Sequence, residues 1–132
     1  MTLLLDTTTV SALLRRVPGV VRRIDVYLHG PQLAICVNTR GELLYGFERL
    51  PAGRKRESLA KELEVCFSQI PCVPTPETAG DQYARLRHEA DSRGTPMGHN
   101  DLWIAATALA LDATLVTTDS DFAQCQGLRI ED

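Results

Sequence analysis

The chain has 132 residues, of which 44% are hydrophobic and 23% charged, and its formal net charge is −3. This composition excludes disordered and fibrous proteins, and the length suffices for one domain with a substantial core. The longest apolar run, 103–111, is too short to cross a bilayer, and the N-terminus does not resemble a signal peptide. We therefore expect one cytoplasmic domain, residues 1–132, with no membrane association.

The first half of the chain predicts two strands, each followed by two helices. Short apolar runs indicate the strands, and apolar residues three and four positions apart indicate the helices. In chain order these are a strand at 2–5, helices at 10–17 and 20–28, a strand at 33–37, and helices at 39–50 and 59–67. Breaks at Pro18-Gly19 and at 51–53 separate the helices of each pair.

The second half continues the alternation and completes an α/β pattern. The predicted elements are a short strand at 70–73, a helix entered at Thr75-Pro76 and ended by Gly94, a helix at 101–111 capped by His99 or Asn100, and strands at 114–117 and 128–130. Alternating strands and helices predict three layers, with a mostly parallel central sheet of four to five strands flanked by helices.

Acidic residues follow two of the predicted strands directly. Asp6 comes after the first strand, and Asp119 and Asp121 come after the strand at 114–117. The carboxyl ends of parallel strands share one edge of the sheet, where functional crevices form. We therefore expect these carboxylates to lie at the same edge.

Each acidic residue also has a purely structural explanation. Asp6 is suited to cap the helix after it, and Glu42 ends a Thr-x-x-Glu pattern typical of a capping box. Asp101 lies at the start of its predicted helix, where a negative charge is favourable. Asp119 and Asp121 fit an ordinary turn. Taken singly, none of the five identifies a site.

Together the carboxylates indicate a metal centre. Like charges repel and raise one another's pKa unless a cation compensates. Ligands that are all oxygen suit Mg²⁺ or Mn²⁺, which can activate water for hydrolysis. His99, two residues before Asp101, fits a cap or surface residue or one that faces substrate. The sequence has no recognisable nucleophile triad and no GxxxxGK loop.

The four cysteines form no CxxC pair, which makes a zinc site less favoured than reduced thiols. We expect Cys36, Cys66 and Cys72 to be buried, since their neighbours are apolar.

The charge distribution allows a polyanionic partner. Without the five acids above, the 17 acidic residues become 12 against 14 basic ones, a balance of +2. Two basic groups, one at 15–23 and one at 49–56, fit either solvated helix faces or a phosphate-binding surface.

Five segments of the chain form a pattern when taken together. They read Leu-Leu-Leu-Asp-Thr (3–7), Gly-Glu-Leu-Leu-Tyr-Gly (41–46), Tyr-Ala-Arg-Leu-Arg (83–87), Asn-Asp-Leu-Trp-Ile-Ala-Ala (100–106) and Leu-Val-Thr-Thr-Asp-Ser-Asp-Phe (115–122). These segments resemble PIN-domain ribonucleases and, more closely, the toxin components of VapBC toxin–antitoxin pairs. The block at 100–106 is the most specific, and the resemblance runs almost from end to end.

The resemblance implies a PIN-like fold and a Mg²⁺-dependent endoribonuclease, with Mn²⁺ as an alternative ion. It also implies a homodimer, an RNA substrate and a VapB-like antitoxin partner. The implied catalytic residues are Asp6, Glu42, Asp101, Asp119 and Asp121, with Asp6, Asp101, Glu42 and Asp121 as metal ligands. Which of Asp119 and Asp121 is the fourth acid stays open. Thr7 and Thr117 are implied to hold carboxylates by hydroxyl hydrogen bonds.

One position departs from the family pattern, because Thr8 stands where the family usually has asparagine. We expect looser positioning of Asp6, or compensation by another polar group.

Two alternatives remain. A phosphotransfer enzyme of the haloacid-dehalogenase type would have an aspartate at position 8, where this chain has Thr8, and a lysine near the phosphate. The only lysines, Lys55 and Lys61, lie in the helical segment between the second and third predicted strands. The other alternative is a non-catalytic RNA-binding or interaction module with a vestigial site. Retention of every acidic position disfavours it.

Overall fold

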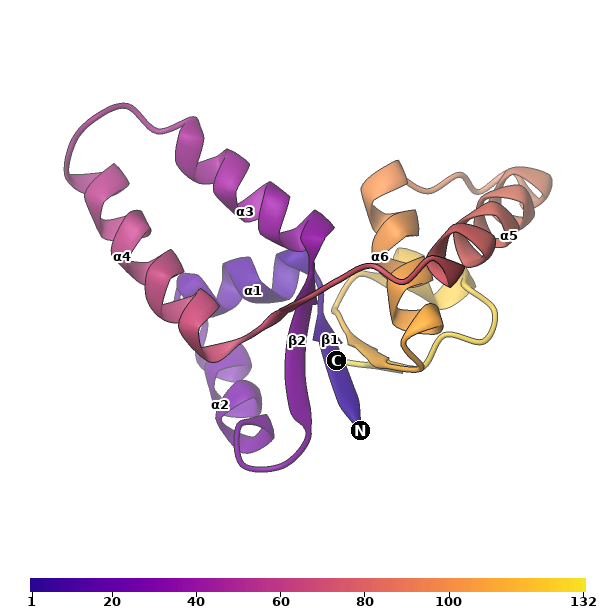
Figure 1. Cartoon of the computed structure of the whole chain (residues 1–132), viewed down its shortest axis with the longest axis horizontal. Helices are drawn as coiled ribbons and strands as arrows, with labels where there is room; N and C mark the ends of the chain where they lie inside the picture. Colours follow the sequence, from indigo (N-terminus) through magenta and orange to yellow (C-terminus); the bar gives the residue numbers. More distant parts are fainter.

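Five parallel strands form one central sheet, and helices cover both of its faces (Figure 1). The computed structural model describes residues 1–132. The strands are β1 (Thr2–Leu5), β2 (Gln32–Cys36), β3 (Cys72–Val73), β4 (Thr114–Val116) and β5 (Ile130–Glu131). The helices are α1 (Thr7–Leu14), α2 (Pro18–Tyr27), α3 (Val37–Glu48), α4 (Arg54–Gln69), α5 (Thr78–Arg93), α6 (His99–Ala110) and a 3-10 helix, η1 (Ser120–Gln124). The predicted fold class is confirmed.

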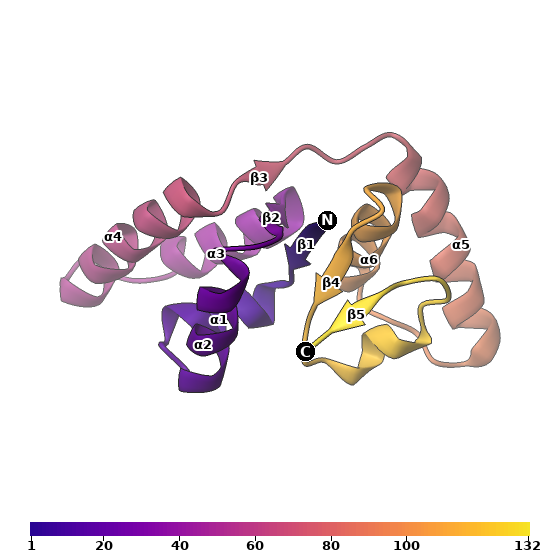
Figure 2. The ribbon, with the colours of Figure 1, turned by 90° about the horizontal axis from the view of Figure 1, so that it is seen from below.

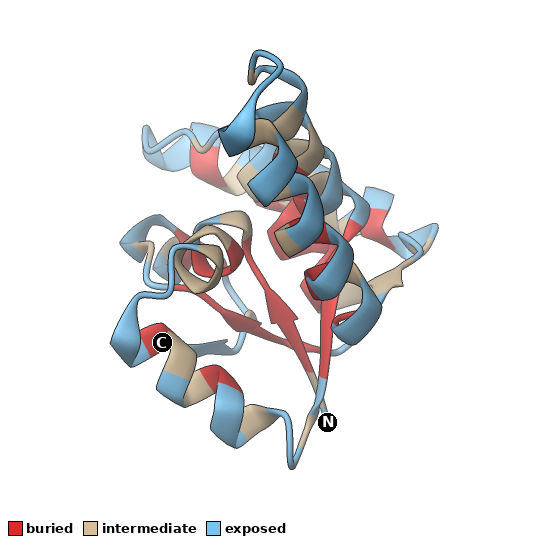
Figure 3. Ribbon diagram, turned by 90° about the vertical axis from the view of Figure 1, so that its left-hand side faces the viewer, coloured by how far each residue is buried: buried red, intermediate tan, exposed pale blue.

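Each face of the sheet has its own hydrophobic core. In β1, Leu4 packs in the core beneath α5 and α6, whereas Leu3 and Leu5 pack in the core beneath α1–α4. All three leucines are fully buried, and Figure 3 shows the central strands as the buried part of the molecule. Burial on both faces explains why the strands read as continuous apolar runs rather than as alternating patterns.

The order of the strands places one crevice at the centre of the sheet. The order is β3-β2-β1-β4-β5, so the chain moves outward from β1 to β3 and then returns to the other side of β1. Figure 2 shows β4 beside β1, with β5 beyond it. The carboxyl ends of β1 and β4 therefore flank the topological switch point, where ligands bind in open α/β sheets.

The predicted starts of α3 and α6 are wrong because both helices begin without a capping side chain. Val37 begins α3 rather than ending β2, and Cys36 is the N-cap. Thr39 consequently lies inside the helix, so the capping box predicted for Glu42 does not form. Helix α6 begins at His99 and its N-cap is Gly98, so neither His99 nor Asn100 caps it.

The remaining differences concern where elements begin and end: α1 begins at Thr7 rather than 10, and α4 at Arg54 rather than 59. Helix α5 begins at Thr78 rather than at the predicted Thr75-Pro76, but it ends as predicted at Gly94, whose φ of 71° suits glycine. The 3-10 helix η1 was not predicted, and the last strand lies at Ile130–Glu131 rather than 128–130. None of the helices has the length and apolar character needed to span a membrane.

The four cysteines are free thiols. Cys36 and Cys66 are buried as predicted, whereas Cys72 is only partly buried because β3 is an edge strand. Cys125 is buried as well, and burial raises the pKa of its thiol to about 11. This thiol is therefore protonated at neutral pH and is a poor nucleophile.

Candidate active site

Asp6 stands at the carboxyl end of β1 with its side chain fixed from two sides. Its Oδ1 accepts a hydrogen bond from the backbone N–H of Thr9 at 2.9 Å, which makes it the N-cap of α1. Its Oδ2 accepts a hydrogen bond from the Thr117 hydroxyl at 2.5 Å. Asp6 is 3% exposed, so both bonds lie in a dry environment. The two bonds leave lone pairs on both oxygens for a further ligand.

Thr117 joins the ends of β1 and β4. While its hydroxyl donates to Asp6, the same oxygen accepts a hydrogen bond from the backbone N–H of Asp119 at 3.0 Å. The Asp119 carboxylate in turn accepts one from the backbone N–H of Asp121 at 2.9 Å and caps η1. The loop after β4 is thus tied to Asp6 through one hydroxyl group.

Glu42 reaches the same region from α3. The Thr7 hydroxyl donates a hydrogen bond to Glu42 Oε1 at 2.9 Å, and the Thr39 hydroxyl lies 3.2 Å from that of Thr7. Both threonine positions implied by the resemblance therefore contact a carboxylate: Thr7 contacts Glu42 and Thr117 contacts Asp6. Their effect on activity remains a prediction.

Asp101 is the carboxylate that the others surround. It lies in the first turn of α6 and is partly buried, and burial is the largest cause of its raised pKa. The negative charges of Asp119, Glu42, Asp6 and Asp121 raise it further, in that order. All five predicted carboxylates therefore gather at one place. Asp119 acts on Asp101 more strongly than Asp121, whose side chain is exposed.

The arrangement fits a magnesium ion better than an ion held entirely by protein ligands. No three His, Cys, Asp or Glu side chains lie close enough together to hold a metal ion by themselves. Mg²⁺ usually keeps several waters and binds one or two carboxylates together with substrate phosphates. The convergent donors are all carboxylate oxygens, and the charges acting on Asp101 are all negative. A divalent cation would relieve that repulsion.

Thr8 and His99 stand apart from the acidic cluster. The Thr8 side chain is exposed and makes no hydrogen bond, so it does not position Asp6. Thr9 does so instead: its N–H bonds Asp6, and its hydroxyl donates to the Val116 carbonyl at 3.0 Å. His99 hydrogen-bonds the Tyr83 hydroxyl of α5 through Nδ1, at 2.7 Å.

Sequence reasoning missed Thr9 and an amide pair at the edge of the site. The contact of Thr9 with Asp6 could have been predicted, because Thr9 lies three residues after an N-cap aspartate and its N–H is in the position that such a side chain accepts from. Asn38 of α3 donates to the Oδ1 of Asn100 of α6 at 3.4 Å. These asparagines are 62 positions apart, so no local sequence pattern predicts their contact.

Comparisons with known proteins agree with this fold. Residues 3–128 match the family model described as PIN domain. The chain is 28% identical to Ribonuclease VapC2 of Rickettsia felis, covering 97% of this chain and 95% of that protein. It is 30% identical to VapC ribonuclease Y4jK of Sinorhizobium fredii, covering 97% and 94%. The crystal structure of VapBC2 from Rickettsia felis bound to a DNA fragment from their promoter superposes with a TM-score of 0.90, at 26% identity, covering 99% of this chain and 98% of that one.

Proposed function

The chain belongs to the PIN-domain family, and from this premise we infer that it is a metal-dependent endoribonuclease, the toxin of a type II toxin–antitoxin pair. We propose that residues 1–132 act as a single nuclease domain that hydrolyses RNA phosphodiester bonds. The observation that carries this proposal is the gathering of four carboxylates around Asp101 at the switch point of the sheet. Relatives named as VapC ribonucleases support RNA as the substrate.

We propose that Asp6 and Asp101 bind the ion directly and that Glu42 helps to orient the ion or its water. Of the two acids after β4, Asp121 is the ligand that the resemblance implies, and both add negative charge to the cluster. Magnesium bound there, or manganese, would activate water and offset the negative charge of the phosphate.

Threonine residues of the chain contribute by orienting the carboxylates of the site. Thr9 and Thr117 fix the two oxygens of Asp6, so this carboxylate does not have to reorganise when substrate arrives. Thr7 holds Glu42 toward the cluster from α1. Burial of Asp6 keeps its charge in a low-dielectric environment, where its attraction for a cation is strengthened.

Removal of divalent metal tests the proposal directly. We expect end-labelled single-stranded RNA to be cut in Mg²⁺, to stay intact in EDTA, and to be cut again when excess Mg²⁺ is restored. Because water rather than the ribose 2′-hydroxyl attacks, the products should carry no 2′,3′-cyclic phosphate. Cleavage that continues unchanged in EDTA would contradict the metal role.

Loss of the Thr117 hydroxyl should weaken the site without dismantling it. Thr117→Val keeps the side-chain shape but frees Asp6 Oδ2, and groups of this kind typically change metal affinity or activity by about 10- to 100-fold. We expect a higher Mg²⁺ concentration for half-maximal cleavage. Thr117→Ser, which retains the hydroxyl, should stay near wild type. If Thr117→Val and wild type required the same Mg²⁺ concentration, Thr117 would have no role in metal binding.

We further propose a VapB-like antitoxin partner, a homodimeric state and a cytoplasmic location. The solved structures of VapBC2 from Rickettsia felis and VapBC-1 from Haemophilus influenzae support the antitoxin. Co-expression with any small protein that is encoded next to this chain tests it, since the two should purify together. If they do not, the toxin role loses its support while the nuclease activity can still be measured separately.

A further inference from the structure

We infer that one face of α3 binds the RNA strand beside the cleavage position. This face, called here the α3 stripe, consists of Asn38, Glu42, Tyr45 and Arg49. In it, the Tyr45 ring stacks on a base and the Arg49 guanidinium contacts a phosphate. The inference rests on the proposed ribonuclease function and identifies the surface that holds the substrate.

The α3 stripe begins at the acidic cluster. Its members are four, three and four positions apart, a spacing that places them on one side of a helix. Asn38 contacts Asn100, the residue before Asp101, and Glu42 is itself one of the acids. At the helical rise, Arg49 lies about 10 Å along the axis from Glu42. A strand whose phosphate lies at the carboxylates can therefore continue along this face.

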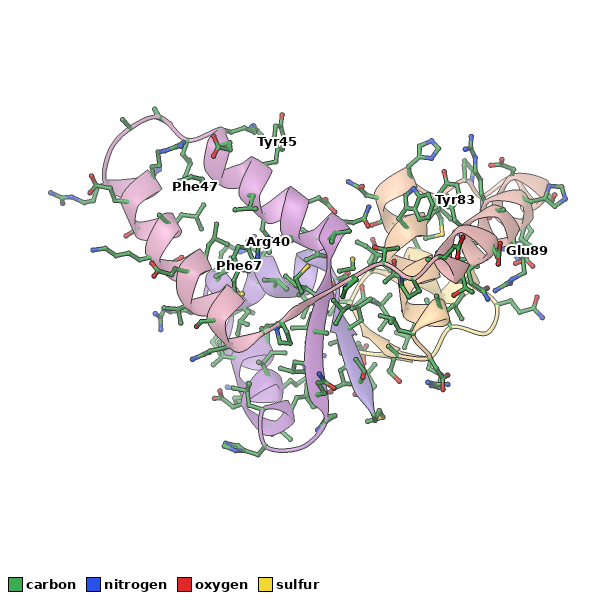
Figure 4. All side chains as sticks on the ribbon, viewed as in Figure 1. Arg40, Tyr45, Phe47, Phe67, Tyr83 and Glu89 are labelled. Atoms are coloured by element: carbon green, nitrogen blue, oxygen red, sulfur yellow. The ribbon has the colours of Figure 1, made fainter.

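Tyr45 is the exposed aromatic residue of the stripe. Its side chain is 64% exposed, and Figure 4 shows it on the outer side of α3, away from α4. The Arg49 guanidinium lies 5.6 Å from the centre of its ring and forms no ion pair. A single exposed aromatic side chain is ordinary, but one paired with a free cation beside an acidic site is suited to a nucleotide.

The other cation–π pairs of this helix hairpin have a structural role. Arg40 lies 4.3 Å from the Phe67 ring and Arg56 lies 4.1 Å from the Phe47 ring, and these rings are partly buried between α3 and α4. Arg56 also donates hydrogen bonds to carbonyls at the C-terminal end of α3. Those pairs hold the two helices together, whereas the Tyr45 pair holds nothing within the chain.

Two glycines keep the surface beside the stripe open. Gly41 lies one turn before Tyr45, and Gly46 lies one turn after Glu42. A Cβ added at either position would meet no atom within 4 Å, so packing inside the chain does not require glycine there. Glycine inside a helix is less favourable than alanine by roughly 0.5–1 kcal/mol. The open surface above the two glycines leaves room for a nucleic-acid strand along the stripe.

Cleavage kinetics of Tyr45 variants test the stacking contact. With a labelled 12-nucleotide single-stranded RNA and enzyme in excess, Tyr45→Ala should raise the half-saturating enzyme concentration about 5- to 100-fold, the range of one lost base stack. The maximal cleavage rate should stay close to wild type, because the carboxylates are unchanged. Tyr45→Phe and Tyr45→Trp keep a stacking ring and should keep wild-type saturation.

Salt dependence tests the phosphate contact. In an Asp101→Asn background, where cleavage is blocked, the affinity for the same RNA can be measured by fluorescence anisotropy at several salt concentrations. A plot of the logarithm of the association constant against the logarithm of the salt concentration has a negative slope. Arg49→Ala should make this slope less steep by about 0.7, as expected for the loss of one phosphate contact on a single strand. Arg54→Ala removes the same charge from an exposed position off the stripe and should change the slope less.

The outcomes separate this inference from the function on which it rests. If the wild-type protein does not cut RNA, the proposed function fails. If it does, and Tyr45→Ala saturates like wild type, the α3 stripe does not bind the substrate. If Tyr45→Ala instead disrupts the homodimer or antitoxin co-purification and leaves RNA saturation unchanged, the stripe is a protein interface and the inference is wrong. Thermal melts of each variant establish that it is folded.

Discussion

Asp101→Asn is expected to lower the rate of RNA cleavage by more than about 100-fold, the upper range for groups that only support metal ligands. The same substitution should stabilise the metal-free protein. Burial and four neighbouring carboxylates disfavour the charge of Asp101, and together they outweigh the helix dipole at the first turn of α6, so removing this charge should stabilise the folded chain. We expect a gain of about 0.2–1 kcal/mol in the free energy of unfolding, the size of charge interactions at partly exposed sites.

The stability gain should depend on pH in a defined direction. Burial and the neighbouring charges raise the pKa of Asp101 above its ordinary value in the folded protein. As the pH falls through that raised pKa, folded wild type takes up a proton before the unfolded chain does, and its repulsion is relieved. The difference between Asp101→Asn and wild type should therefore be largest at neutral pH and shrink in acid, measured by urea unfolding in EDTA.

Asp81→Asn provides a matched control. Asp81 also lies in the first turn of a helix, α5, but it is exposed and outside the cluster. Removing the Asp81 charge should lower the free energy of unfolding slightly, by about 0.3–1 kcal/mol, because the helix dipole stabilises a carboxylate in the first turn. If Asp101→Asn destabilises the protein as Asp81→Asn does, the carboxylates do not repel as described. If it leaves cleavage intact, the metal-dependent mechanism is wrong.

Phe122→Ala should have the largest effect on stability, lowering the free energy of unfolding by about 3–5 kcal/mol. Phe122 is 1% exposed and is among the largest fully buried side chains. It extends from η1 into the core beneath α5 and α6, and so anchors the segment that carries Asp119 and Asp121. We expect loss of folding at physiological temperature, or loss of activity in whatever folded protein remains.

A milder substitution separates packing from other causes. Phe122→Leu keeps most of the buried volume and should lose less than about 2 kcal/mol, smaller than the truncation to alanine. Urea unfolding followed by circular dichroism compares the two variants. A loss below 1 kcal/mol for Phe122→Ala would mean that η1 is held by its backbone and cap alone.

The sequence predicted the sheet well because buried parallel strands are short apolar runs with distinct ends. Runs at 2–5, 33–37 and 114–117 identified the three central strands to within a residue. The helix starts at Val37 and His99 were missed, because the chain turns there without a marked capping residue. The 3-10 helix after Asp119 was missed too, since five residues carry no usable periodicity.

For the candidate site, sequence indicated which residue types converge but not how they are held. The position of Asp6 and Asp119 after adjacent strands followed from the topology of a parallel sheet. The hydroxyl contacts did not: Thr117 and Asp6 are 111 positions apart, and Thr7 and Glu42 are 35 apart. Such pairings depend on strand register and helix placement, which no local pattern in the sequence specifies.

The hydrogen bond from Thr117 to Asp6 has a consequence for biosynthesis. One partner directly follows β1, and the other directly follows β4, 111 positions later. The central strand β1 thus lacks one of its two neighbours until β4 has been made. An unfinished chain can bury its α1–α4 half, but it has neither Asp119 nor the hydroxyl that orients Asp6. We therefore expect that a chain released before the loop after β4 has been made cannot assemble the acidic cluster.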